Sequence, residues 1–148
     1  MAYILLVDDD PESLWALQVA LESDGHRVTI AAGAPQALAV LRHEAVQVMI
    51  TDYEMPDIDG AELCRRARAQ PAYCALPIVM LSAAPEPKSP RHWTSFLRKP
   101  VRLDELTAII DAHAAVRLPR WTAPVRALPL FANSYAVRWP GLDPRRWP

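Results

Sequence analysis

The sequence predicts an α/β fold built on a doubly wound, five-stranded parallel sheet. Short apolar runs of strand length alternate along the chain with longer stretches in which apolar residues recur at helical spacing. The apolar runs are continuous, which is typical of strands that are covered on both faces, as in a parallel sheet. Strand–helix alternation of this kind favours right-handed crossovers within one open sheet.

Five segments have the length and composition of strands, and the last of them is weaker than the others. They are residues 3–7, 27–31, 46–51, 77–81 and 95–98. Four segments predict helices. They are residues 11–25, 34–44, 60–69 and 103–116. The first helix begins at Pro11, a good first helical residue, and Gly25 is its expected stop. Asp10, directly before Pro11, is a candidate N-cap.

Composition and length indicate one globular domain. A chain of 148 residues can bury a proper core, and 51% hydrophobic residues with a formal charge of −1 are typical of soluble proteins. Cys64 and Cys74 lack metal-type spacing and are expected to be free thiols. The apolar run at 3–7 is followed by acids and lacks a basic leader and a membrane-spanning length, so we expect a cytoplasmic protein without a membrane partner.

The strand–helix pattern stops after Val116, so we expect one domain over 1–118 and a tail over 119–148. The tail holds six of the fifteen prolines, three of the five tryptophans, and five arginines with a single acid. The domain is acidic, with 11 Lys and Arg against 16 Asp and Glu. These features predict a Pro/Trp-rich tail that forms no separate domain. It either packs on the acidic domain, of its own chain or of a second subunit, or stays solvated.

Polar residues stand at the carboxyl ends of the predicted strands, where α/β sheets bind ligands. Strand one leads into Asp8 and Asp9, strand three into Asp52, strand four into Ser82 and strand five into Lys99. Carboxylates that converge repel one another unless a cation neutralises them, and oxygen ligands without His or Cys favour Mg²⁺. A Lys and a hydroxyl beside them predict a carboxylate nucleophile that accepts a phosphoryl group.

Four motifs in the chain resemble, in order and spacing, the signatures of response regulator receiver domains of two-component signalling. The motifs are ILLVDDDP, VMITDYEMPDIDG, PIVMLSA and FLRKP, and the match covers about residues 3–117. The resemblance implies the flavodoxin-like, CheY-like strand order 2-1-3-4-5. It also implies a stand-alone phosphorylation-dependent switch rather than an enzyme.

The resemblance gives a role to each strand-end residue. Asp52 would be the phosphoacceptor, and Ser82 and Lys99 would bind the phosphoryl oxygens. Phe96 stands at the aromatic switch position, although an aromatic residue here is equally well explained as core. Pro100 resembles the cis-proline of the family.

The resemblance also implies a magnesium site. Asp9 would bind Mg²⁺ directly and Asp8 mainly through water, while Asp52 and the backbone carbonyl of Glu54 would complete the protein ligands. The side chain of Glu54 is expected to lie on the loop surface. Gly60 stands at the usual turn after the phosphorylation loop.

The chain departs from the family between its fourth and fifth strands. Pro85, Pro87 and Pro90 remove amide donors and push the residues before them out of the helical region. A crossover needs about a dozen residues, so the chain can still pass from one strand to the next. We therefore expect the fourth helix to be shortened or absent, with at most one turn around 91–95. Its loss should expose apolar side chains over strands four and five, which the tail could cover.

The resemblance implies partners as well. The phosphoryl donor would be a sensor histidine kinase or a histidine phosphotransfer protein, and the output would be binding to a downstream protein. No direct DNA binding is expected, because residues 119–148 are too few for the winged-helix DNA-binding domains that follow many receivers, and five arginines without a fold are a weak nucleic-acid signal. A homodimer through the remodelled fourth-helix region or the tail is compatible with the pattern. Two alternatives stay open: a Mg²⁺-dependent aspartyl-phosphate phosphohydrolase, and a receiver-like scaffold that no longer responds to phosphorylation.

Overall fold

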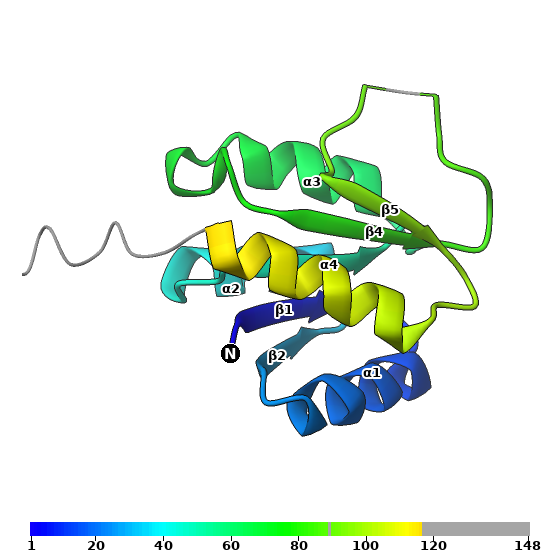
Figure 1. The fold of residues 1–148 in the computed structure, drawn as a ribbon. Helices are drawn as coiled ribbons and strands as arrows, with labels where there is room; N and C mark the ends of the chain where they lie inside the picture. Colours follow the sequence, from blue (N-terminus) through cyan, green and yellow to red (C-terminus); the bar gives the residue numbers. More distant parts are fainter. Residues whose placement is uncertain (89, 117–148) are drawn as a thin grey trace, which may run out of the picture. The chain divides into compact units, whose positions relative to one another are not determined.

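The computed structural model describes residues 1–88 and 90–116. Their strands form one parallel sheet in the order β2-β1-β3-β4-β5, which confirms the predicted topology (Figure 1). The strands are β1 (Tyr3–Val7), β2 (Arg27–Ala31), β3 (Val48–Asp52), β4 (Ile78–Ser82) and β5 (Ser95–Arg98). The helices are α1 (Pro11–Ser23), α2 (Ala34–His43), α3 (Gly60–Arg68), the 3-10 turn η1 (Pro71–Tyr73) and α4 (Leu103–Val116).

Two layers of helices cover the sheet, α1 and α4 on one face and α2 and α3 on the other (Figure 1). Successive side chains of a strand point to opposite faces. On β1, Ile4 and Leu6 therefore pack with α1 and α4, while Leu5 and Val7 pack with α2 and α3. All four side chains are buried, which explains why the strand segments read as continuous apolar runs.

The strand register brings the carboxyl ends of neighbouring strands to one edge of the sheet. Asp52, the last residue of β3, pairs with Leu81 on β4, and Ser82, the last residue of β4, pairs with Arg98 on β5. Residues that follow one strand therefore lie beside residues that follow the next. This alignment, rather than any nearness in sequence, assembles the polar site.

Small differences from the predicted elements fall at their ends. Helix α1 ends at Ser23 and the chain turns at Gly25, whose φ of 86° suits a residue without a Cβ. Strand β3 begins at Val48, two residues later than predicted. The turn η1 was not predicted; it buries Tyr73, whose hydroxyl donates to the backbone carbonyl of Glu44.

No helix connects β4 and β5 among residues 83–88 and 90–94. The helix that receiver domains have between these two strands was predicted to be lost, and this prediction is confirmed; the helix labelled α4 is the one that follows β5. Figure 1 shows this connection as a long irregular excursion from the sheet. Trp93 anchors the end of this connection in the core. The Trp93 side chain is only 4% exposed and packs on the sheet face that α2 and α3 cover. The Trp93 Nε1–H donates to Glu86 Oε1 (2.8 Å), and the Thr94 amide donates to the Ile78 carbonyl (2.8 Å).

The expected exposure of apolar side chains over β4 and β5 is wrong. Every residue of β4 is buried, and Trp93 contributes to the cover that the missing helix would otherwise give. In the described part of the chain, the large exposed apolar residues lie elsewhere. They are Met1, Trp15, Val19, Ile30 and Leu103. This finding removes one of the reasons for expecting the tail to pack over β4 and β5. The tail itself, 119–148, lies outside the described residues, so its packing stays a prediction.

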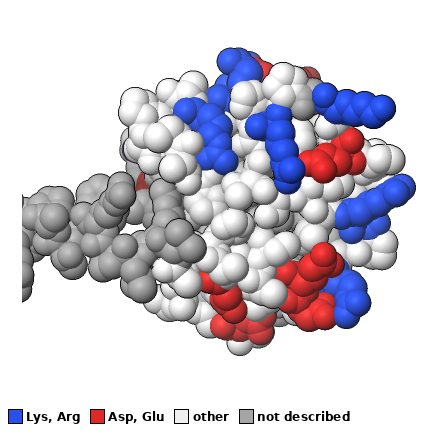
Figure 2. All heavy atoms as spheres, turned by 45° about the horizontal axis from the view of Figure 1, so that its top comes forward, with Lys and Arg blue, Asp and Glu red and all other residues white. Residues whose placement is uncertain are grey.

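Charges of both signs lie on the face that Figure 2 turns forward, with uncharged surface between them. On α3, Glu62 forms ion pairs with Arg65 (2.7 Å) and Arg66 (2.8 Å). Hydrogen bonds from these two guanidinium groups lower the pKa of Glu62 to about 2. No helix in the described residues is both long and apolar enough to cross a membrane.

The role of Trp93 as an anchor predicts a large difference between two tryptophans. Trp93→Ala should lower the free energy of unfolding by about 3–5 kcal/mol, because a buried indole leaves a cavity in the core. Trp15→Ala should change it by less than about 0.5 kcal/mol, because Trp15 is 68% exposed on α1. Urea denaturation followed by circular dichroism measures both values, and equal losses would show that Trp93 does not anchor the connection.

Candidate functional site

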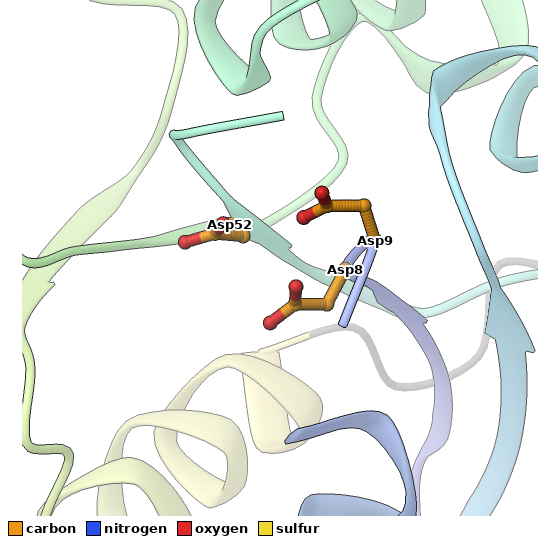
Figure 3. A group of neighbouring side chains, drawn as sticks. All are labelled: Asp8, Asp9 and Asp52. Carbon is orange, nitrogen blue, oxygen red and sulfur yellow. The ribbon is translucent and has the colours of Figure 1, made fainter. Parts of the chain in front are cut away.

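Three carboxylates from two strand ends meet at the carboxyl edge of the sheet (Figure 3). Asp8 and Asp9 follow β1, and Asp52 ends β3. One oxygen of each residue lies within 4.8 Å of an oxygen of the others. Asp8 and Asp52 are buried, at 3% and 4% exposure, whereas Asp9 is exposed. The convergence that the sequence predicted is therefore present.

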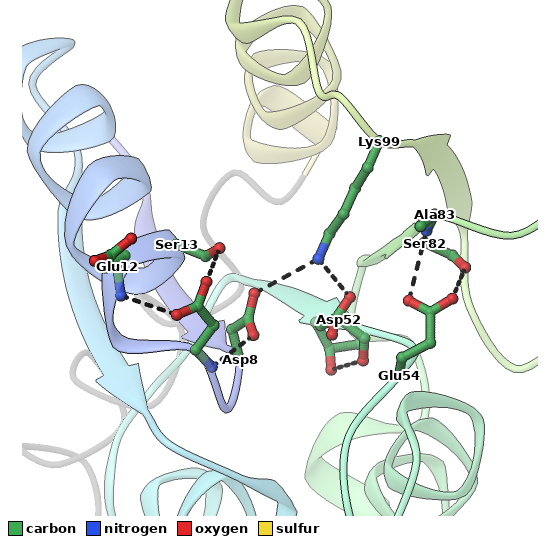
Figure 4. A network of polar contacts seen from close by, with 10 residues as sticks. Asp8, Glu12, Ser13, Asp52, Glu54, Ser82, Ala83 and Lys99 are labelled. Atoms are coloured by element: carbon green, nitrogen blue, oxygen red, sulfur yellow. Dashed lines mark hydrogen bonds and ion pairs between the residues drawn. The ribbon is translucent and has the colours of Figure 1, made fainter.

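Lys99 reaches this cluster from the end of β5 (Figure 4). Its Nζ atom lies 2.8 Å from Asp52 Oδ1 and 3.8 Å from Asp8 Oδ2. The Lys99 amide donates to the Ser82 carbonyl (2.8 Å), and the peptide bond to Pro100 is cis. Burial by itself would lower the pKa of Lys99, but the hydrogen bond and the charges of the nearby carboxylates raise it. Lys99 therefore stays cationic.

One lysine does not neutralise the cluster. Burial raises the pKa of Asp52, and the hydrogen bond and charge of Lys99 oppose this rise without cancelling it. Burial also raises the pKa of Asp8, helped by the charges of Asp52 and Asp9 and opposed by the Asp10 amide and Lys99. The ionised carboxylates are thus held at a cost that a further cation would relieve.

The donor set fits a hard divalent cation. Carboxylate oxygens without nitrogen or sulfur are the ligands of Mg²⁺ rather than of zinc or copper. Ligands of one Mg²⁺ ion stand about 2.1 Å from it, so they lie at most about 4.2 Å apart. The oxygens of Asp8, Asp9 and Asp52, within 4.8 Å of one another, need only small side-chain shifts to share an ion.

Ser82 is buried at the end of β4, and its hydroxyl donates to Glu54 Oε1 (2.8 Å). The second Glu54 oxygen lies 3.5 Å from the Ala83 amide nitrogen (Figure 4). The Ala84 amide donates to Ser82 Oγ (3.0 Å). Burial would raise the pKa of Glu54, but the hydrogen bonds from Ser82 and the following amides outweigh it, and this pKa is lowered.

The contact between Glu54 and Ser82 was not predicted, since the Glu54 side chain was expected on the loop surface. A signal for it was present in the strand order. Glu54 follows β3 by two residues and Ser82 ends the adjacent strand β4, so a side chain as long as glutamate can span the distance.

Gly60, the first residue of α3, lies against the backbone of Asp52 and Tyr53. A Cβ added at Gly60 would lie 2.3 Å from the Asp52 carbonyl oxygen and 2.9 Å from the Tyr53 Cα. The Gly60 amide also donates to the Tyr53 carbonyl (3.0 Å). The first residue of α3 thus packs directly on the backbone that carries Asp52, and no side chain fits between them.

Phe96 lies on β5 and is half-buried. It pairs with Met80 on β4 and packs against the core cluster of α2 and α3. This placement agrees with a core residue as well as with a switch, so its switching role stays a prediction. The role of the Glu54 backbone carbonyl as a metal ligand also stays a prediction.

This open α/β sheet, with an acidic cluster and a lysine at its carboxyl edge, has a counterpart among known families. Residues 4–111 match the response regulator receiver domain family. The chain therefore belongs to the response regulator receiver domains, as its motifs predicted.

Known relatives differ in how much of their length this chain spans. It is 36% identical over 115 residues to the transcriptional regulatory protein GlrR of Escherichia coli, covering 74% of this chain but only 26% of GlrR. It is 29% identical to the protein PilH of Pseudomonas aeruginosa, covering 78% of this chain and 99% of PilH. The solved structure of the response regulator TrrA of Thermotoga maritima, in complex with Mg²⁺-BeF, superposes with a TM-score of 0.70 at 26% identity, covering 76% of this chain and 99% of TrrA.

The raised pKa of Asp8 predicts that its charge destabilises the metal-free protein. A folded-state pKa above the unfolded value means that stability falls as pH rises through that window. Asp8→Asn should therefore raise the melting temperature at pH 7 by a few degrees without Mg²⁺, and this gain should shrink as the pH falls towards 4. Thermal unfolding in chelator across this pH range measures the effect.

Asp10 is the matched control, because hydrogen bonds from Ser13 and the Glu12 amide lower its pKa. Its ionised form supports the fold above the unfolded pKa, so Asp10→Asn should leave the melting temperature at pH 7 unchanged or slightly lower. A fall in melting temperature for Asp8→Asn equal to that for Asp10→Asn would contradict the conclusion that the charge of Asp8 destabilises the metal-free protein.

The close packing at Gly60 predicts a second pair of variants. Gly60→Ala should lower the free energy of unfolding by about 2–3 kcal/mol, because the new methyl group meets backbone atoms that have no room to move. Gly33→Ala should stay within about 0.5 kcal/mol, since its Cβ would meet only Pro35 Cδ at 3.9 Å. Chemical denaturation measures both, and a stable Gly60→Ala protein would show that the loop relaxes freely.

Proposed function

We propose that this protein is a phosphorylation-dependent switch in which Asp52 accepts a phosphoryl group from a phosphohistidine. The donor is a sensor histidine kinase or a histidine phosphotransfer protein. The observation that best supports the proposal is the buried Asp52 carboxylate with Lys99 Nζ at 2.8 Å and two further carboxylates beside it. A nucleophilic carboxylate needs nearby positive charge to receive a dianionic group.

In the transfer, an ionised oxygen of Asp52 forms a bond to phosphorus. The bond between phosphorus and the donor imidazole nitrogen breaks, and its electron pair stays on the imidazole. Lys99 neutralises part of the charge on the oxygens of the moving group, and the Ser82 hydroxyl donates a hydrogen bond to one of them. The charge of Lys99 also favours the ionised, nucleophilic form of Asp52.

Asp8, Asp9, Asp52 and the backbone carbonyl of Glu54 would hold a Mg²⁺ ion beside the acceptor. When bound, the ion would supply positive charge against the phosphoryl oxygens. The close set of carboxylate oxygens supports this assignment. The Mg²⁺-BeF complex of the relative TrrA, of similar fold, also supports it.

The output would be phosphorylation-dependent binding to another protein. The surface that reports the signal would include β5 with Phe96 and the irregular connection between β4 and β5. Because this connection replaces a helix, a partner or a second subunit would meet a surface that differs in shape from that of receiver domains with a helix here. We expect no direct DNA binding by the tail, 119–148.

A single labelling experiment tests the proposal. Acetyl phosphate should add one phosphoryl group in a Mg²⁺-dependent and hydroxylamine-labile manner, measured as intact mass. Asp52→Asn should abolish the adduct, and Asp9→Ala should raise the Mg²⁺ concentration that is needed, because a carboxylate ligand is lost. Asp57→Asn is the matched control and should be labelled like the parent, since asparagine tolerates the φ of 66° at this position.

Three results would contradict the proposal in different ways. An adduct that survives Asp52→Asn would place the acceptor elsewhere. Continuous release of phosphate at enzymatic rates would indicate the phosphohydrolase. A parent protein that takes up no phosphoryl group would indicate a scaffold that no longer responds.

A further inference from the structure

The hydroxyl of Ser82 has one proton to donate, and it donates this proton in a hydrogen bond to Glu54. The Ser82 side chain is fully buried, and its Oγ donates to Glu54 Oε1 at 2.8 Å. The same oxygen accepts a hydrogen bond from the Ala84 amide, which fixes the direction of the hydroxyl. A hydroxyl that donates to one anion is not available to another at the same time.

Glu54 also presents its second oxygen to the backbone at the end of β4. Oε2 lies 3.5 Å from the Ala83 nitrogen, so the hydroxyl and the amide converge on one carboxylate (Figure 4). The Ser82 hydroxyl and the Ala83 amide thus form a small anion site, which the Glu54 carboxylate occupies. Asp52 ends the neighbouring strand, and the charge of Glu54 helps burial to raise the pKa of Asp52.

We propose that the Glu54 carboxylate is an internal stand-in for the phosphoryl group, which must displace it from Ser82 and Ala83. The inference rests on the proposed function, because that function assigns the Ser82 hydroxyl to a phosphoryl oxygen; the Ala83 amide is the second donor that Glu54 would release. Glu54 holds the end of β4 in place while Asp52 is unmodified. On phosphorylation the carboxylate is released from this edge, and its exchange partner is the phosphoryl group itself.

This exchange makes Glu54 a competitor whose strength depends on Ser82. Removing the Glu54 carboxylate frees the hydroxyl for an incoming anion, so anion affinity rises. If Ser82 is first replaced by alanine, the principal contact of Glu54 is gone and its removal has little further effect. A purely long-range charge effect would instead be the same with and without the hydroxyl.

The test measures the affinity for beryllofluoride, a phosphoryl analogue, in saturating Mg²⁺ by fluorine NMR on the full chain. Glu54→Ala should tighten binding by about tenfold, as expected for the loss of a charged hydrogen-bond competitor. Glu54→Gln should fall between the parent and Glu54→Ala, because a neutral amide oxygen accepts the hydroxyl less strongly. In the Ser82→Ala background, Glu54→Ala should change the affinity less than twofold.

Glu12→Ala is the matched control, since it removes one acidic charge at the same edge of the sheet. In Figure 4, Asp8 and Asp52 lie between Glu12 and Ser82. It should change the affinity less than twofold, and thermal unfolding confirms that each variant is folded.

Two results would overturn the inference while leaving the proposed function intact. One is an equal gain for Glu54→Ala with and without Ser82, and the other is an equal gain for Glu12→Ala and Glu54→Ala. A parent protein that binds no beryllofluoride in Mg²⁺, and takes up no phosphoryl group from acetyl phosphate, would overturn both.

Discussion

The confinement of negative charge at the carboxyl edge of the sheet is the constraint on which the site depends. Asp8 and Asp52 are buried side by side, and Lys99 neutralises only part of their charge. Buried like charges of this kind raise one another's pKa and reduce stability. The rest of the fold must supply the stability that this edge gives up. The fully buried strands β3 and β4 do so, together with Ile4 to Val7 of β1.

Rigid contacts around the edge keep the charged groups together. Gly60 lets α3 pack directly on the Asp52 backbone, and the Lys99 amide donates a hydrogen bond to the Ser82 carbonyl. A looser arrangement would let the carboxylates separate and so relieve their repulsion. The close packing therefore preserves an arrangement that is unfavourable by itself and that the proposed binding of a cation and a phosphoryl group requires.

The sequence was sufficient to predict what depends on topology and insufficient for what depends on side-chain direction. Continuous apolar runs and strand ends predicted that Asp8, Asp52 and Lys99 converge, because parallel strands align their carboxyl ends. The Glu54–Ser82 contact depends on rotamers, which no periodicity encodes. The prolines between β4 and β5 correctly excluded a helix, but they gave no indication that Trp93 would fold back into the core.

The Glu54–Ser82 contact and the buried Trp93 give the connection between β4 and β5 an anchor at each end. It begins at Ala83 and Ala84, whose amides face Glu54 and Ser82, and it ends at Trp93, which is buried and bonded to Glu86. A connection without helical hydrogen bonds of its own depends on such anchors for its conformation. Release of Glu54 would alter the first anchor and leave the second in place. Phosphorylation at Asp52 would then be transmitted to the segment that replaces the helix, by an exchange of anions at a single hydroxyl.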